Sequence, residues 1–309
     1  MTAEKPPGWL VDLSLVGICL IWGATFILVK QALADISTLL FLTLRFTAAA
    51  VVLAWIFRRQ FRAPNLRMSL RAGVLAGLCL FSGYVLQTFG LKYTSASKTG
   101  FLTGLYIPLV PLFSSIVYKK IPQISELFGV GAAFAGMALM TIQTDLLDIN
   151  KGDLLAAGCA VVYAFHILLL GHFAGTSNLG VLIVTQIATG MGVGAATFWW
   201  AEPVHVKWTP NVWAALAITS LFATALAFSV QTWAQRWSSP TRTALIFSME
   251  PVFAWAASYV LAGEVLSRRG TLGAVLILSG ILIVELKPMR FFERNQKPDT
   301  RNQKPETRN

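Results

Sequence analysis

Apolar residues occur in long runs along most of the chain, and short polar segments separate these runs. The runs are about 17–22 residues long, the length that a helix needs to cross a hydrocarbon layer about 30 Å thick. The pattern predicts an all-α integral membrane protein. Ten transmembrane helices are expected, over residues 13–30, 37–57, 72–91, 99–118, 125–142, 154–172, 179–200, 212–234, 242–261 and 271–286.

Amino-acid composition strengthens this prediction and indicates which classes of partner the protein contacts. The chain is 55% hydrophobic and only 13% charged, whereas a soluble domain carries about 25% charged residues. Its net charge is +11, but the basic residues lie between the apolar runs and in the C-terminal tail. This placement is typical of topology signals and of contact with anionic lipid. We therefore expect membrane lipid as a partner and no nucleic acid.

The two halves of the chain repeat at a nearly constant offset. An offset of 144 residues pairs Gln87 with Gln231, and an offset of 141 pairs Asp12 with Asp153. Each half contains five of the predicted spans. Because five is odd, the second half enters the membrane from the opposite side, which makes the repeats inverted. The predicted units are a first five-helix repeat, a second inverted five-helix repeat and a disordered basic tail, over residues 1–150, 151–290 and 291–309.

Basic residues also predict the orientation in the membrane. With both termini in the cytoplasm, the cytoplasmic segments hold 17 Lys and Arg residues and the outer segments hold 7. This asymmetry favours a multi-pass inner-membrane protein with both termini cytoplasmic. The tail contains two similar polar heptapeptides that begin at Arg294 and Arg301. They have no apolar face, so the tail is expected to be disordered.

No sequence pattern points to a cofactor. The three cysteines fall in different apolar runs without the spacing of a metal site, and no phosphate-binding Gly-x4-Gly-Lys-Ser/Thr motif occurs. We therefore expect neither a metal nor another cofactor. An enzyme would also need titratable groups that converge at one depth, whereas Arg45, His166 and Glu250 are scattered along the chain. The prediction is that the protein is not an enzyme.

Short motifs in order along the chain match a known family over about residues 10–287. They are Leu20-Ile21-Trp22-Gly23-Ala24-Thr25-Phe26, Leu44-Arg45-Phe46, Leu91-Lys92-Tyr93-Thr94-Ser95-Ala96, Met249-Glu250-Pro251-Val252-Phe253 and Gly263-Glu264. The chain resembles the EamA-type ten-span members of the drug/metabolite transporter superfamily. The second half departs from the pattern because Val162-Tyr163-Ala164 stands where a Trp-Gly signature would be. The resemblance implies a secondary carrier, commonly an exporter of amino acids or related metabolites, with its substrate cavity between the repeats.

Two charged residues inside spans are candidates for the transport chemistry. Arg45 lies in the middle of the second span, where lipid exposure costs about 2.5–3.5 kcal/mol, so it should face the protein interior. It would either bind a substrate carboxylate or tie helices together. Glu250 precedes Pro251 in the ninth span, and a carboxyl group in such a medium can exchange protons. The alternative is a kinked helix end whose carboxylate bonds to its own backbone.

Other polar and aromatic residues could line the same cavity or simply pack. His166 could titrate near neutral pH or be a satisfied interior residue, and the two repeat-related glutamines could bond across the repeats or meet the substrate. Four aromatic residues near mid-span could surround a ligand or only fill space. The predicted cavity residues are Arg45, Trp22, Tyr84, Gln87, Tyr106, Tyr163, His166, Gln231 and Glu250.

These features predict a secondary transporter that exports small organic metabolites, amino acids first, across the inner membrane by alternating access. Protons are a candidate coupling ion. The first alternative is an organic-anion or sugar-phosphate exchanger, in which Arg45, Lys98 and Arg242 bind the anion; the latter two could instead reach lipid headgroups. A second alternative is a structural membrane subunit without a polar cavity. Glycines on the fifth and tenth spans could pack together or against a second protomer, so monomer and homodimer both stay open.

Overall fold

The computed structural model describes residues 5–62, 65–94, 96–119, 122–141, 150–262 and 267–285, and this part of the chain is almost entirely helical. Its only β pairing is an isolated bridge between Ile36 and Val206. The predicted tail lies outside the described residues. The elements are α1 (Gly8–Ala32), α2 (Thr38–Phe57), η1 (Arg58–Arg62), α3 (Leu66–Tyr93), α4 (Ala96–Thr103), α5 (Tyr106–Tyr118), α6 (Ile124–Thr141), α7 (Lys151–Phe173), α8 (Leu179–Thr197), α9 (Pro210–Ser220), η2 (Leu221–Leu226), α10 (Ala227–Ala234), α11 (Pro240–Phe247), α12 (Glu250–Ala262) and α13 (Arg268–Glu285).

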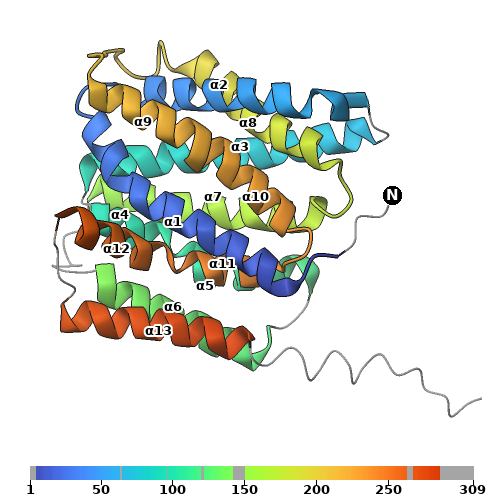
Figure 1. The fold of residues 1–309 in the computed structure, drawn as a ribbon, viewed down its shortest axis with the longest axis vertical. Coiled ribbons are helices and arrows are strands. Elements are labelled where there is room, and N and C mark those ends of the chain that lie inside the picture. The colour runs from blue at the N-terminus through green and yellow to red at the C-terminus, as the bar shows by residue number, and fades with distance from the viewer. Residues whose placement is uncertain are drawn as a thin grey trace, which may run out of the picture.

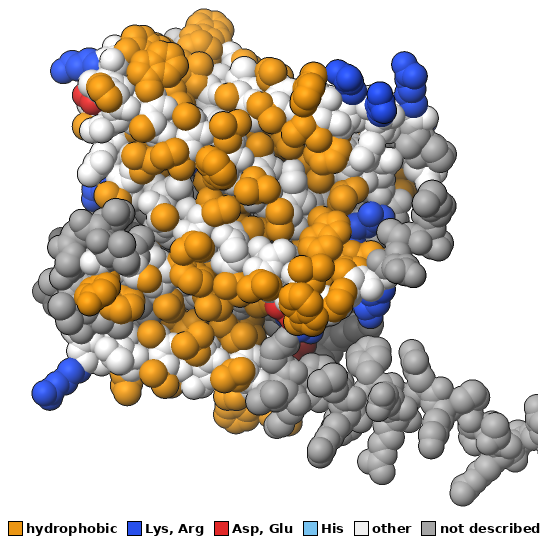
Figure 2. Space-filling model, viewed as in Figure 1, with side chains coloured by type: hydrophobic (Ala, Val, Ile, Leu, Met, Phe, Trp, Pro, Cys, Tyr) orange, Lys and Arg blue, Asp and Glu red, His pale blue; other side chains and the backbone are white. Residues whose placement is uncertain are grey.

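Seven helical segments of the described chain are long and apolar enough to cross a membrane. They are Gly8–Ala32, Thr38–Arg62, Leu66–Tyr93, Thr99–Tyr118, Lys151–Phe173, Leu179–Thr197 and Pro210–Ala234. In Figure 2, apolar side chains cover the middle of the visible face, and Lys and Arg side chains lie toward its two ends. Lipid tails would cover such a belt while the charged ends reach the headgroups. The fold is therefore that of a multi-pass membrane protein.

The helices lie side by side, and α6 and α13 form a pair at one edge of the molecule (Figure 1). A Cβ atom added to Gly129 would lie 2.6 Å from the carbonyl oxygen of Gly280, and one added to Gly136 would lie 2.8 Å from the amide nitrogen of Ile277. Only glycine therefore permits this close crossing. The small-residue faces expected on the fifth and tenth spans pack against each other within one chain.

Two helical segments are interrupted near their middle. α4 ends at Thr103 and α5 begins at Tyr106, whereas α11 ends at Phe247 and α12 begins at Glu250. The second interruption follows the first at the 144-residue offset seen in the sequence. Pro251 contributes to it because proline has no amide hydrogen to donate to the carbonyl of Phe247 four residues earlier. Both interruptions place a helix start beside the interior of the molecule.

A third irregularity lies between α9 and α10. Residues Leu221–Leu226 form the π-helix η2, whose widened turns disturb the usual pattern of backbone hydrogen bonds. The carbonyl oxygen of Ala223 accepts a hydrogen bond from the indole Nε1 of Trp22 at 3.0 Å. The π-helix thus offers a backbone acceptor to a side chain of α1, which lies across the molecular interior.

Candidate functional site

One cavity in the interior brings the sequence-predicted residues together. Its volume is about 90 Å³, enough for several water molecules or part of a small metabolite. All nine predicted residues line it: Trp22, Arg45, Tyr84, Gln87, Tyr106, Tyr163, His166, Gln231 and Glu250. The expectation that Arg45, His166 and Glu250 are scattered was wrong. Residues far apart in sequence converge here because their helices are neighbours in the fold.

Arg45 is held by three neutral groups from other helices. Its Nε donates to Oγ1 of Thr224 at 2.7 Å, and its Nη2 donates to the hydroxyl of Tyr84 at 3.0 Å and to the carbonyl oxygen of Ala223 at 3.3 Å. The guanidinium carbon lies 4.5 Å from the centre of the Tyr84 ring. No acidic side chain in the described chain forms an ion pair with Arg45. The arginine therefore ties helices together and still presents an uncompensated positive charge to the cavity.

Glu250 brings a carboxyl group to the same cavity. It is the first residue of α12 and is partly exposed. Within the described part of the chain, its carboxylate has neither an ion-pair partner nor a hydrogen bond to its own helix. A carboxylate without a protein partner in a cavity of low polarity favours either a proton or a cationic ligand. The arrangement leaves both possible.

His166 belongs to a buried chain of hydrogen bonds. The hydroxyl of Thr232 donates to the carbonyl of Phe228 at 2.6 Å, so its oxygen accepts from Nε2 of Gln186 at 2.9 Å. The other amide atom, Oε1 of Gln186, therefore faces Nε2 of His166 at 3.1 Å. Since an amide oxygen only accepts, the geometry places a proton on Nε2 of His166. The remaining ring nitrogen, Nδ1, acts as an acceptor when the ring is neutral.

The side-chain amides of the two repeat-related glutamines, Gln87 and Gln231, differ in their hydrogen bonds. Gln87 has only long contacts, at 3.4 Å, with the hydroxyls of Tyr163 and Thr103. Gln231 is 1% exposed and donates to Oε1 of Gln235 at 3.1 Å, while its own Oε1 has no partner among the described residues. A buried acceptor left unpaired costs about 1–3 kcal/mol.

Aromatic rings form much of the cavity wall and also pack on one another. The ring of Trp22 lies 5.0 Å from that of Phe247, and the ring of Tyr84 lies 6.0 Å from that of Tyr163. Both pairs are edge-to-face, which is a favourable arrangement of aromatic rings. Tyr106, at the start of α5, is 6% exposed. The same side chains therefore pack on one another and line the cavity.

The cavity also includes residues that the sequence did not single out. Three hydroxyl-bearing residues contribute polar atoms, and two phenylalanines extend the aromatic wall; they are Thr25, Thr88, Thr103, Phe228 and Phe247. Isolated threonines in apolar runs give little signal, because most of them bond to their own helix. Outside the lining, Gln186 supports His166 and lies at the position that the 141-residue offset of the repeat pairs with Arg45.

Comparison with known proteins gives a consistent result over nearly the whole chain. The model of the EamA-like transporter family matches residues 9–142 and again residues 150–286. An uncharacterized transporter from Archaeoglobus fulgidus is 33% identical over 277 residues, covering 89% of this chain and 86% of its own. The uncharacterized transporter YyaM from Bacillus subtilis is 26% identical, with coverage of 88% and 92%.

Two further comparisons are more distant. The uncharacterized inner membrane transporter YedA from Escherichia coli K12 is 22% identical, covering 88% of this chain and 90% of its own. A solved crystal structure superposes with a TM-score of 0.75 at 18% identity, covering 89% of this chain and 97% of that chain. At that identity the likeness concerns the fold alone.

Proposed function

Because the chain belongs to the EamA-like transporter family, we propose that it is a secondary transporter that exports small zwitterionic metabolites, amino acids first, across the inner membrane by alternating access. The observation that carries this proposal is that a basic and an acidic side chain lie on the wall of one cavity. Arg45 and Glu250 each lack an oppositely charged protein partner within the described chain, and they line one cavity.

The chemistry of a zwitterion fits these groups. An arginine guanidinium recognises a carboxylate, and a carboxylate recognises an ammonium group. The aromatic wall can stabilise a cation or an apolar side chain. A proton and an ammonium group would compete for Glu250. This competition would exchange one substrate molecule for one proton.

The architecture proposed for this carrier is ten membrane spans in two inverted repeats, over residues 1–150 and 151–290, with both termini cytoplasmic. The two successive matches of one family model support a duplication. The interruptions before Tyr106 and Glu250, which occupy equivalent positions in the two halves, support it further. Inverted repeats give related conformations that face opposite sides of the membrane.

The alternatives receive less support from the cavity. An organic-anion or sugar-phosphate exchanger would use Arg45, Lys98 and Arg242, but Arg242 forms an ion pair with Asp12 and Glu250 would repel an anion. The side chain of Lys98 lies outside the described residues. A structural subunit would need no polar cavity, whereas nine polar or aromatic candidates surround one here.

Counterflow in proteoliposomes tests the proposed function. Vesicles loaded with one unlabelled compound are diluted into its radiolabelled form, with separate trials of neutral amino acids, organic acids and sugar phosphates. We expect uptake of at least one neutral amino acid, and its loss in Arg45→Gln, which removes the proposed partner of the substrate carboxylate. Counterflow of sugar phosphates alone would favour the anion exchanger. Absence of counterflow with every compound would contradict a carrier of these classes.

A further inference from the structure

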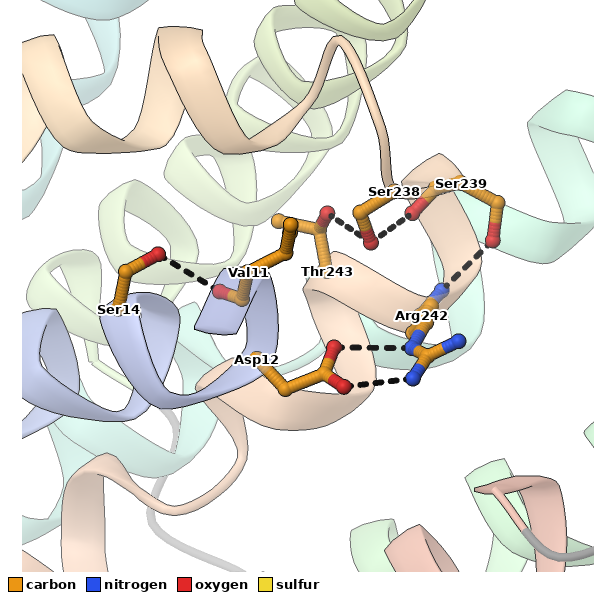
Figure 3. A network of polar contacts seen from close by, with 7 residues as sticks. All are labelled: Val11, Asp12, Ser14, Ser238, Ser239, Arg242 and Thr243. Carbon is orange, nitrogen blue, oxygen red and sulfur yellow. Dashed lines mark hydrogen bonds and ion pairs between the residues drawn. The ribbon is translucent and has the colours of Figure 1, made fainter. Parts of the chain in front are cut away.

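A bidentate ion pair joins the beginnings of two helices from different halves of the chain (Figure 3). Nε of Arg242 donates to Oδ1 of Asp12 at 3.0 Å, and its Nη2 donates to Oδ2 at 2.6 Å. Asp12 lies in the first turns of α1 and Arg242 in the first turn of α11. Oγ of Ser239 caps α11 by accepting from the amide of Arg242 at 3.2 Å, which fixes the start of that helix.

An apolar layer lies between this ion pair and the cavity. Leu15 and Ile18 of α1 are at most 1% exposed, as is Leu245 of α11, and all three belong to one buried cluster. Trp22, the first cavity residue on α1, follows Asp12 by ten residues, or about 15 Å along a helix. The cavity is therefore closed toward the face at which α1 begins.

The cavity extends in the other direction. Its lining includes Val29 near the end of α1, and Thr88 and Leu91 near the end of α3. No residue of the first three turns of α1 belongs to the lining found in the described chain. The closed side is therefore the one that carries Asp12.

The repeat relates this layer to residues near the opposite face. An offset of 141 residues places the smaller Ala156 where Leu15 stands and the smaller Cys159 where Ile18 stands, whereas an offset of 144 places the larger Phe101 where Leu245 stands. The smaller side chains of α7 offer less apolar area to hold the helices together. The two faces are thus closed by different sets of side chains although their backbones are related.

We propose that the Asp12–Arg242 ion pair and the apolar layer beneath it form the gate that closes the cavity at the face where α1 begins. This rests on the proposed alternating-access function, since the gate must separate whenever the cavity opens to that face. A partly exposed ion pair suits the task because its modest strength lets it break and re-form in each cycle. The exposed fraction is 32% for the Arg242 side chain and 20% for Asp12.

Site-directed thiol labelling tests the gate without any substrate. The native cysteines are replaced by alanine, and Thr103→Cys serves as a reporter inside the cavity. Sealed vesicles of either orientation are treated with a membrane-impermeant thiol reagent. We expect Asp12→Asn and Arg242→Gln each to raise the labelling rate from the face that carries Asp12 by about two- to fivefold. Exchanging the charges, with Asp12→Arg and Arg242→Asp together, should return the rate toward that of the unmodified pair.

Lys92→Gln provides the matched control. It removes the ion pair between Lys92, at the end of α3, and Glu202, in which Nζ of Lys92 lies 3.1 Å from Oε1 of Glu202. This variant should leave labelling from the Asp12 face unchanged. Equal rates in all variants, or an equal rise in Lys92→Gln, would overturn the gate. If one of the two single variants does not accumulate in the membrane, the labelling rates of the other single variant and of the charge-exchanged double variant still test the gate. Counterflow by the protein together with unchanged labelling would contradict the proposed gate and not the proposed function. Faster labelling in the gate variants without any counterflow would contradict the proposed function and not the gate.

Discussion

The guanidinium Nε of Arg45 donates to Oγ1 of Thr224 at 2.7 Å, across 179 residues of sequence. Thr224 is fully buried in the π-helix η2, and its own hydroxyl donates to the carbonyl of Thr219 at 2.8 Å. The threonine oxygen is thereby oriented to accept from Arg45. The irregular helix and the buried charge therefore depend on each other, which explains why an arginine can be held at this depth without an acidic partner.

Replacing Thr224 with valine should destabilise the protein. The change keeps the shape of the side chain but leaves a buried charged donor without its acceptor, at an expected cost of about 1–3 kcal/mol in the free energy of unfolding. Thermal unfolding in detergent micelles measures the loss. Thr47→Val is the control, because the hydroxyl of Thr47 bonds only to the carbonyl of Thr43 in its own helix. Equal losses in the two variants would contradict a special role for Thr224.

Replacing Gln186 with leucine should also destabilise the interior. The variant removes the acceptor from Nε2 of His166 and the donor to Thr232 at once. The Nε2 group of His166 then lacks an acceptor, whereas Thr232 still donates to the carbonyl of Phe228, so the free energy of unfolding should fall by about 1–3 kcal/mol. Adding His166→Phe to this variant should recover part of the loss, since no unpaired imidazole remains. A double variant less stable than Gln186→Leu alone would argue against this hydrogen-bonded chain.

The close crossing of α6 and α13 predicts opposite effects for two glycines of one helix. In Gly136→Ala, the new methyl group would meet the carbonyl of Gly273 and lie 2.8 Å from the amide of Ile277, so the helices must separate. We expect a loss of about 1–3 kcal/mol in unfolding free energy. In Gly131→Ala the methyl group meets nothing within 4 Å, and a gain of up to about 1 kcal/mol follows from helix propensity. Equal melting temperatures for the two variants would show that the crossing is not tightly packed.

Glu250→Gln should uncouple transport from the proton gradient. The amide keeps the size of the side chain but can no longer gain or lose a proton, so a pH difference across the vesicle should cease to drive accumulation of substrate. Uptake is measured with and without an imposed pH gradient, and Glu202→Gln is the control because Glu202 lies outside the cavity lining. Unchanged stimulation by the gradient would place proton coupling elsewhere.

Much of the helical layout follows from the apolar runs. The range 37–57 predicted for the second span agrees with α2 at Thr38–Phe57, whereas the range 72–91 falls short of α3, which begins at Leu66. The first turns of α3 contain Arg67 and Arg71, and these charges conceal the helix from a hydropathy pattern. Helix ends that extend beyond the hydrocarbon layer lack the apolar signal, so the sequence underestimates them.

The sequence could predict which residues line the cavity, but not how their side chains are arranged. Buried polar groups are costly in a membrane, so the spans' arginine, glutamate and glutamines had to face the interior. Their partners could not be foreseen: neither the ion pair between Asp12 and Arg242, 230 residues apart, nor the π-helix that receives Arg45 has a local signature. Both depend on how distant helices pack, and a single sequence does not encode that explicitly.

The glycine crossing between α6 and α13 has a mechanical consequence under the proposed inverted repeat. Exchanging the repeats carries Gly129 to Gly273 and Gly280 to Gly136, so the Gly129–Gly280 contact becomes the Gly136–Gly273 contact and the crossing maps onto itself. The Asp12–Arg242 contact instead maps onto a different pair of residues at the opposite face. A motion that swaps the conformations of the two halves would therefore leave α6 and α13 in register with each other. Under the proposed alternating access, that helix pair would be the pivot on which the remaining helices turn.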